Sequence, residues 1–186
     1  MRRISGAVAV LGMLALAGCG GGDPLPTLPP TPSSTPVFAS EEEALAAAEE
    51  AYAAYLEAWA LIASEGGVNP ERIASHAVGE FYEAEIEGFR TLRDNQWRVV
   101  GASRLQGAEL QFADLEGSQS SAVVAAYLCV DVSGVDVLDT QGASVVSPSR
   151  PNLQAFEVTF DLDGDGGLVP SDRSPWEAGS VCTASE

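Results

Sequence analysis

Lysine is absent from this chain of 186 residues, and its nine basic residues are all arginines, against 27 aspartates and glutamates. The formal net charge at pH 7 is −18. A surface this acidic repels phosphate backbones, so we do not expect a nucleic-acid partner. The charge is explained most simply by solubility, with a specific cationic partner as the alternative.

Residues for common catalytic and metal chemistry are also scarce. With a single histidine, His76, the chain has no Cys/His cluster of zinc type and no serine or cysteine nucleophile paired with a base. It has no phosphate-binding glycine loop either, so no cofactor is expected. His76 lies three residues after Ile73, near the apolar side of a short helix. It is a candidate for the mouth of a pocket, or a hydrogen-bonded helix residue.

No apolar run is long enough to span a membrane. Met1-Arg2-Arg3 and the apolar residues 4–17 instead predict a signal peptide over residues 1–18. The segment Leu16-Ala17-Gly18-Cys19 resembles the lipobox of bacterial lipoproteins. That resemblance implies cleavage before Cys19 and attachment of acyl chains such as palmitate, which would anchor the protein to the extracytoplasmic face of the cell membrane. The alternative is an ordinary secreted protein.

Cleavage changes the charge and the cysteine count. Removing residues 1–18 leaves seven arginines against 27 acids, a net charge of 7 − 27 = −20. With Cys19 acylated, Cys129 and Cys182 remain, and we predict a disulfide between them outside the cell. Two buried thiols are the alternative.

Residues 19–39 contain six prolines and little that is apolar. This composition predicts a linker with an extended polyproline character and a reach of about 60 Å. The folded domain is therefore expected to span residues 40–186.

Apolar residues at a spacing of three and four predict helices in the first part of this domain. Ser40 and Glu43 form a capping box, and the apolar stripe that follows ends at Gly66-Gly67. A second helix is expected from Asn69-Pro70 to Ala77, and a third over residues 80–94. The glutamates of the first helix indicate a solvated face, with a partner-binding face as the alternative.

The apolar spacing then changes to every second residue, which predicts strands. These include Trp97–Val99, Leu110–Phe112, a central strand at 122–130, a strand at 156–162 and a last one from Leu168. A small hairpin is expected at residues 140–142. Helices followed by strands indicate an α+β fold with three helices packed in a curved antiparallel sheet of four to six strands.

This order of elements resembles the cone-like fold of nuclear transport factor, ketosteroid isomerase and scytalone dehydratase. A closer resemblance, to uncharacterised actinobacterial lipoproteins, involves Cys129-Val130-Asp131, Val135-Asp136-Val137, Pro175-Trp176, Gly179 and Cys182. The resemblance implies a ligand pocket inside the cone, and in the enzymes of that group an acid or base beside tyrosines.

Several side chains are candidates for such a pocket. Tyr52, Tyr55, Trp59 and Tyr82 carry polar tips, although their helical spacing is first of all that of core residues. Asp114 and Asp131 lie on predicted strands, and alternation alone does not decide which way they point. Trp176 is expected to pack beside the disulfide, with an exposed recognition residue as the alternative.

The segment "DLDGDGGLVPSD" has the spacing of a calcium loop, with Asp161, Asp163, Asp165 and Asp172 as candidate ligands. The aspartates, however, continue the alternation of apolar and polar residues in the strand before this segment. The Asp-Gly pairs are also those that turns prefer. We therefore interpret the segment as the tip of the last hairpin and expect no metal.

These features predict a non-enzymatic module at the cell envelope that binds a small apolar ligand or a protein partner. The alternatives are a pocket enzyme of isomerase or dehydratase type and a calcium-dependent surface protein.

Overall fold

The computed structural model describes residues 36–117, 122–177 and 181–182. The predicted signal peptide, Cys19 and most of the predicted linker lie outside these residues. None of the helices in the described part has the length and apolar content needed to cross a membrane.

The first helix, α1 (Glu41–Ser64), begins where the capping residues predict. The Ser40 hydroxyl accepts a hydrogen bond from the Glu43 amide at 3.3 Å, and the Glu43 carboxylate accepts one from the Ala39 amide at 2.7 Å. Two donors that the helix cannot satisfy internally thus find partners. The helix ends before Gly66 and Gly67, whose positive φ values of 73° and 74° suit glycine.

The second predicted helix is a short 3-10 helix, η1 (Pro70–Ser75), rather than an α-helix. Asn69 precedes it in a left-handed conformation with φ 51°, and its side chain makes no capping bond. Asn69 and Pro70 thus stand at the predicted start of the helix, but the asparagine side chain does not cap it. The third predicted helix is confirmed as α2 (Gly79–Asp94).

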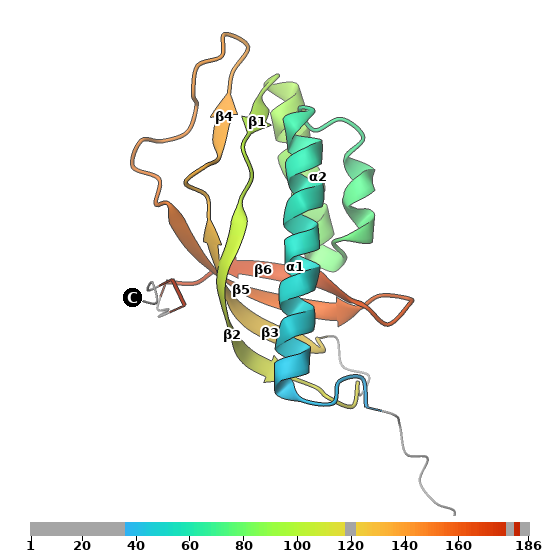
Figure 1. Cartoon of the computed structure of the whole chain (residues 1–186). Helices are drawn as coiled ribbons and strands as arrows, with labels where there is room; N and C mark the ends of the chain where they lie inside the picture. Colours follow the sequence, from blue (N-terminus) through green and yellow to red (C-terminus); the bar gives the residue numbers. More distant parts are fainter. Residues whose placement is uncertain (1–35, 118–121, 178–180, 183–186) are drawn as a thin grey trace, which may run out of the picture. The chain divides into compact units, whose positions relative to one another are not determined.

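The strands form two antiparallel sheets (Figure 1). The larger has the order β2–β3–β5–β6, with β2 Arg104–Ala113, β3 Val124–Asp131, β5 Leu153–Leu162 and β6 Leu168–Pro175. The smaller pairs β1 (Arg98–Val100) with β4 (Asp136–Leu138). Helices followed by a curved antiparallel sheet confirm the predicted α+β class. The position of β3 between β2 and β5 confirms the predicted central strand. The small hairpin near residue 140 is present as a bridge between Leu138 and Ser144.

The smaller sheet and the β2–β3 pair of the larger sheet are two parts of one long hairpin, which bends where they meet. β1 continues into β2 and β3 into β4, but the pairing stops between Val100–Asp136 and Arg104–Asp131. At this break Gly101 has φ +79°, and a Cβ atom there would overlap the carbonyl oxygen of Gly134. The bend therefore needs glycine at residue 101.

Strand β2 contains a second irregularity that overturns one expectation. Alternation predicts that Leu110 and Phe112 share an inward face, but Phe112 is 50% exposed. The pairing with β3 shifts register between these two residues. A bulge of this kind inserts an extra residue and reverses the faces beyond it.

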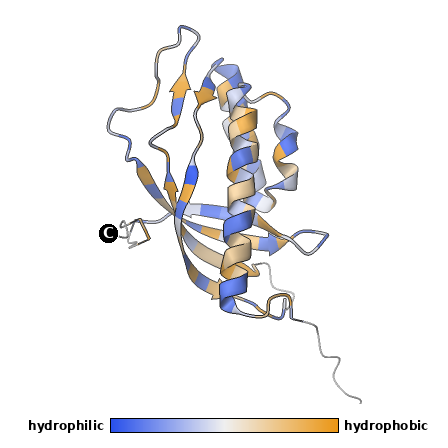
Figure 2. Ribbon diagram, viewed as in Figure 1, coloured by the Kyte–Doolittle hydropathy of each residue, from blue (hydrophilic) through white to orange (hydrophobic). Residues whose placement is uncertain are grey.

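The core lies between α1, α2 and the sheet, and α1 runs across the sheet in Figure 1. In Figure 2, hydrophilic and hydrophobic residues alternate along α1, as expected for a helix with one buried face. Phe38, assigned above to the linker, is only 8% exposed and belongs to this core. The Val37 amide also donates to the Leu115 carbonyl at 2.8 Å. The packed domain therefore begins before the predicted boundary at residue 40.

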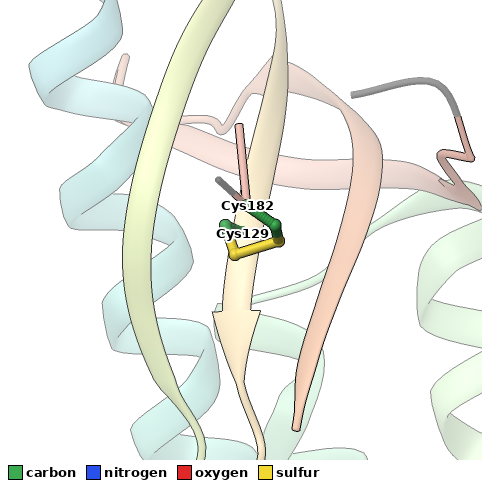
Figure 3. Close-up of a disulfide and its surroundings, with 2 residues drawn as sticks. All are labelled: Cys129 and Cys182. Carbon is green, nitrogen blue, oxygen red and sulfur yellow. A yellow bond between two sulfur atoms is a disulfide. The ribbon is translucent and has the colours of Figure 1, made fainter. Parts of the chain in front are cut away.

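The sulfur atoms of Cys129 and Cys182 form a disulfide, with their Cα atoms 5.0 Å apart. Figure 3 shows it joining β3 to the C-terminal segment. Trp176 stacks on Tyr127, which lies two residues before Cys129 on the same strand, with ring centroids 4.3 Å apart.

Candidate functional site

A cavity of about 410 Å³ lies between α1, α2 and the inner face of the strands. Most of its wall is apolar, and its lining consists of Tyr52, Tyr55, Leu56, Trp59, Ala84, Glu85, Gly88, Leu92, Val99, Ser103, Val130, Val132, Val137, Gln154, Phe156 and Arg173. Among these residues, Ala84 and Gly88 on α2 are exposed. The cavity is therefore open on the α2 side.

The polar centre of the cavity is the Glu85 carboxylate, which comes from α2. The Glu85 side chain is only 6% exposed. One carboxylate oxygen accepts a hydrogen bond from the Trp59 indole at 2.7 Å, and the other accepts one from Arg173 Nη2 at 3.0 Å. Both oxygens of this buried carboxylate thus have donors, one of them a cation, as burial of a charge requires.

The Arg173 guanidinium is fixed on several sides. Its Cζ atom lies 4.8 Å from the Phe81 ring centroid and 4.9 Å from that of Phe156. Its Nη1 donates to the hydroxyls of Tyr52 and Tyr55 at 3.4 and 3.3 Å. Contact with two aromatic rings and a planar set of hydrogen bonds restricts the orientation of the guanidinium.

The ionisation of this cluster follows from its burial. Desolvation, opposed by the charge of Arg173, raises the pKa of Tyr52. Desolvation and the nearby Glu85 carboxylate raise the pKa of Tyr55 well above its ordinary value. Burial opposes the charge of Arg173, but the oxygens of Tyr55 and Tyr52 and the Glu85 carboxylate together raise its pKa. Both phenols are therefore neutral and Arg173 is charged at physiological pH.

Neither Glu85 nor Arg173 was among the residues predicted for the pocket. Glu85 had a detectable signal, because it lies four residues after Phe81 and four before Phe89, on the buried face of α2. Its neighbours Glu83 and Glu87 are exposed, and so the acidic composition of the helix masks it.

Arg173 was missed because the sequence predicts a strand from Leu168 but does not show on which face of that strand each residue lies. Strand β6 lies at the edge of the sheet, where proline is tolerated, and it runs through Pro170. Its pairing with β5 shifts register at Ser171, so that Arg173 lies opposite the buried Val158. The bulge places Arg173 on the inner face of the sheet.

The structure brings together three of the four predicted aromatic candidates. Tyr52, Tyr55 and Trp59 line the cavity, and their hydroxyl and indole groups belong to the Glu85–Arg173 cluster. Tyr82 and His76 are not among the residues that line this cavity. His76 instead follows η1, where its backbone amide donates to the Ile73 carbonyl at 2.8 Å.

Asp131 and Asp114 also lie outside the cavity lining. The Asp131 carboxylate accepts a hydrogen bond from the Ser133 amide at 2.8 Å, and its bonds with Ser133 lower its pKa. The Asp114 carboxylate accepts one from the Glu116 amide at 3.2 Å. Both side chains stabilise turns at the ends of strands.

The segment that resembles a calcium loop is the turn between β5 and β6, so the predicted hairpin is confirmed. The Asp163 side chain accepts hydrogen bonds from the amides of Asp165 and Gly167, both at 2.8 Å. Asp161 lies opposite Val169 and Asp172 opposite Thr159, both within the strands. Over residues 36–117, 122–177 and 181–182, no three His, Cys, Asp or Glu side chains are grouped to hold a metal ion.

Comparison with known proteins gives no match to a protein-family model, to a curated protein or to a solved structure.

Proposed function

We propose that this protein is a lipid-anchored lipoprotein of the cell envelope whose cone-like domain binds a small, mostly apolar ligand. The observation that carries the proposal is the cavity of about 410 Å³ with apolar walls and one buried polar cluster. Ligand sites of proteins have this character, with volumes of roughly 300–1,000 Å³ and a few polar groups that orient the ligand. The anchoring part of the proposal rests on the sequence around Cys19.

An enzyme of the isomerase or dehydratase type is the second candidate. It is favoured by one observation, a buried carboxylate, Glu85, beside Tyr52 and Tyr55 in the cavity. A general base needs a carboxylate oxygen that faces the substrate proton. Each oxygen of Glu85 already accepts one hydrogen bond, from Trp59 or from Arg173. A substrate proton would compete with these donors for the carboxylate, and for this reason we place binding before proton transfer.

The binding function is tested by filling the cavity. Gly88 lines the open side of the cavity, and no atom lies within 4 Å of the position of a Cβ atom there. We expect Gly88→Leu to leave the fold intact, because leucine also has a higher helix propensity than glycine by about 1 kcal/mol. The added side chain should occupy ligand space and weaken binding at least tenfold.

The measurement is calorimetric titration with 2-acetylnaphthalene, an apolar probe of suitable size. The full chain carrying Cys19→Ala is used, so that no detergent competes for the probe. Glu83→Leu, which adds the same side chain at an exposed position of α2, is the matched control and should bind as the parent does. Equal binding by Gly88→Leu and Glu83→Leu would contradict a ligand site in this cavity.

A further inference from the structure

We infer that the ligand is electrically neutral and carries a hydrogen-bond acceptor, such as a carbonyl oxygen, that binds to Arg173. The inference rests on the proposed binding function and adds the chemical class of the ligand. It follows from which hydrogen-bonding groups of the buried cluster are already used and which are left over.

Arg173 has more donors than its protein partners use. A guanidinium has five N–H groups. Nη1 donates to the hydroxyls of Tyr52 and Tyr55, and Nη2 donates to Glu85. Among the residues that the structure describes, neither Nε–H nor the second N–H of Nη2 has a hydrogen-bond partner. The Arg173 side chain is 28% exposed and lines the cavity. Arg173 therefore brings unused donors to the wall of the cavity.

The unused donors are also held in place before a ligand arrives. The centroids of the Phe81 and Phe156 rings lie 4.8 and 4.9 Å from Arg173 Cζ. The bond to Glu85 fixes one edge of the guanidinium. The Arg173 side chain has already lost its conformational freedom on folding, so a ligand acceptor does not have to order it. A charged donor that is ordered in advance binds an acceptor more tightly.

The acceptors of the cluster, by contrast, each already hold at least one hydrogen bond from a protein donor. Each oxygen of Glu85 accepts a hydrogen bond, and the hydroxyls of Tyr52 and Tyr55 accept from Arg173. The N–H groups of Arg173, by comparison, include two that hold no hydrogen bond to a described residue. These charged donors therefore favour a ligand that brings an acceptor.

Charge decides between a neutral and an ionised acceptor. Arg173 and Glu85 cancel each other, and the chain carries a net charge of −18. A ligand carboxylate would be repelled by the negative charge of the chain and would compete with Glu85 for the same guanidinium. An ammonium group would lie beside Arg173 with no free anion. A neutral acceptor on an apolar body satisfies the donors at the lowest electrostatic cost.

Three naphthalenes of matched size test the inference on the full chain carrying Cys19→Ala. They are 2-acetylnaphthalene with a neutral carbonyl, 2-isopropylnaphthalene with no polar group, and 2-naphthoate with a carboxylate. We expect calorimetry to show that the acetyl compound binds about tenfold more tightly than each of the other two, as a hydrogen bond from a charged donor provides. In NMR spectra, the Arg173 Nε–H signal should shift with the acetyl compound and not with the isopropyl compound.

A double variant supplies the protein side of the test. Glu85→Gln/Arg173→Met removes both charges together, so that neither is left buried alone. It should bind 2-isopropylnaphthalene as the parent does and lose the preference for the acetyl compound. Arg90→Met, the same change at an exposed arginine of α2, should keep the preference. If the double variant does not fold, the three probes with the parent chain still decide.

The outcomes separate the inference from the proposed function. Equal affinities for the acetyl and isopropyl compounds would overturn the inference and leave the apolar binding site standing. Tightest binding of 2-naphthoate would overturn it in favour of an anionic ligand. Absence of binding by all three, with no shift of the Trp59 indole signal, would overturn the proposed binding function as well.

Discussion

At the scale of single residues, the buried pair of Glu85 and Arg173 controls the chemistry of the cavity. The Glu85 side chain is 6% exposed and that of Arg173 is 28% exposed. Removing one partner of such a pair leaves an uncompensated charge, which costs more than the pair itself contributes. Tyr52, Tyr55 and Trp59 make the other hydrogen bonds that these two side chains have within the described residues.

We predict that Arg173→Met alone lowers the free energy of unfolding by about 3–5 kcal/mol, because it leaves the Glu85 carboxylate buried without its cation. The double variant Glu85→Gln/Arg173→Met should be more stable than this single variant. Urea unfolding of the wild type, both single variants and the double variant measures the coupling. Additive effects would show that the two residues do not act as a pair.

We predict that the protein loses stability at alkaline pH because Tyr52 and Tyr55 are buried. The pKa values of Tyr52 and Tyr55 are raised above 10.0 in the folded chain, first of all by burial. Above pH 10 the unfolded chain loses phenol protons that the folded chain keeps. The stabilisation is therefore complete below about pH 10 and decreases as the pH rises further. Urea midpoints from about pH 8 to 11 should fall less steeply for Tyr55→Phe than for the wild type, and parallel curves would contradict the assignment.

At the scale of elements, two departures from regular pairing determine what the sheet presents to the cavity. The bulge at Ser171 places Arg173, and not Asp172, opposite Val158 on the inner face. Without it, a carboxylate would face Glu85 across the cavity, and two like charges would be buried together. One extra residue in an edge strand thus decides the sign of the charge beside Glu85.

The bend between β1 and β2 provides a matched pair of glycine substitutions. Gly101 and Gly142 have similar φ values, +79° and +81°, but only Gly101 lies against another backbone segment, at Gly134. Gly142→Ala should cost about 1–2 kcal/mol for its positive φ alone. Gly101→Ala should cost at least about 1 kcal/mol more, because the hairpin must also open. Thermal unfolding measures both, and equal losses would show that the close approach is unimportant.

At the scale of the whole molecule, the disulfide ties the C-terminal segment to the interior strand β3. It joins cysteines 53 residues apart in sequence. Closing a loop of this size restricts the unfolded chain and contributes about 4 kcal/mol in the chain-entropy account. We predict that Cys129→Ala/Cys182→Ala lowers the free energy of unfolding by about 2–4 kcal/mol, measured by urea unfolding without reductant. If reductant lowers the wild type and the double variant equally, the disulfide is not the cause.

The predicted lipid anchor at Cys19 also concerns the whole molecule. We expect the wild type to partition into the detergent phase of a membrane extract and Cys19→Ala to remain in the aqueous phase, because acyl chains contribute about 0.8 kcal/mol per buried methylene. Intact-mass measurement of both proteins checks for the acyl chains directly. Identical partitioning and identical processing would contradict acylation at Cys19.

The sequence by itself determined the elements of this protein. The capping residues Ser40 and Glu43, the stop at Gly66-Gly67 and the continuous apolar run of β3 are local signals, and the helices and strands follow them. The turn at Asp163 was predictable for the same reason, because its residues favour that geometry within a few positions of one another.

Only the tertiary structure decided the site. The pairing of Glu85 with Arg173 joins residues 88 positions apart. It depends on the bulge at Ser171, which no local pattern shows. A shift of one residue in strand pairing exchanges the two faces of a strand, and its energy comes from contacts across the whole sheet. For that reason the sequence offered the three aromatic residues of the cavity only as candidates, with core packing as the favoured interpretation, while the charges beside them became evident only in the folded domain.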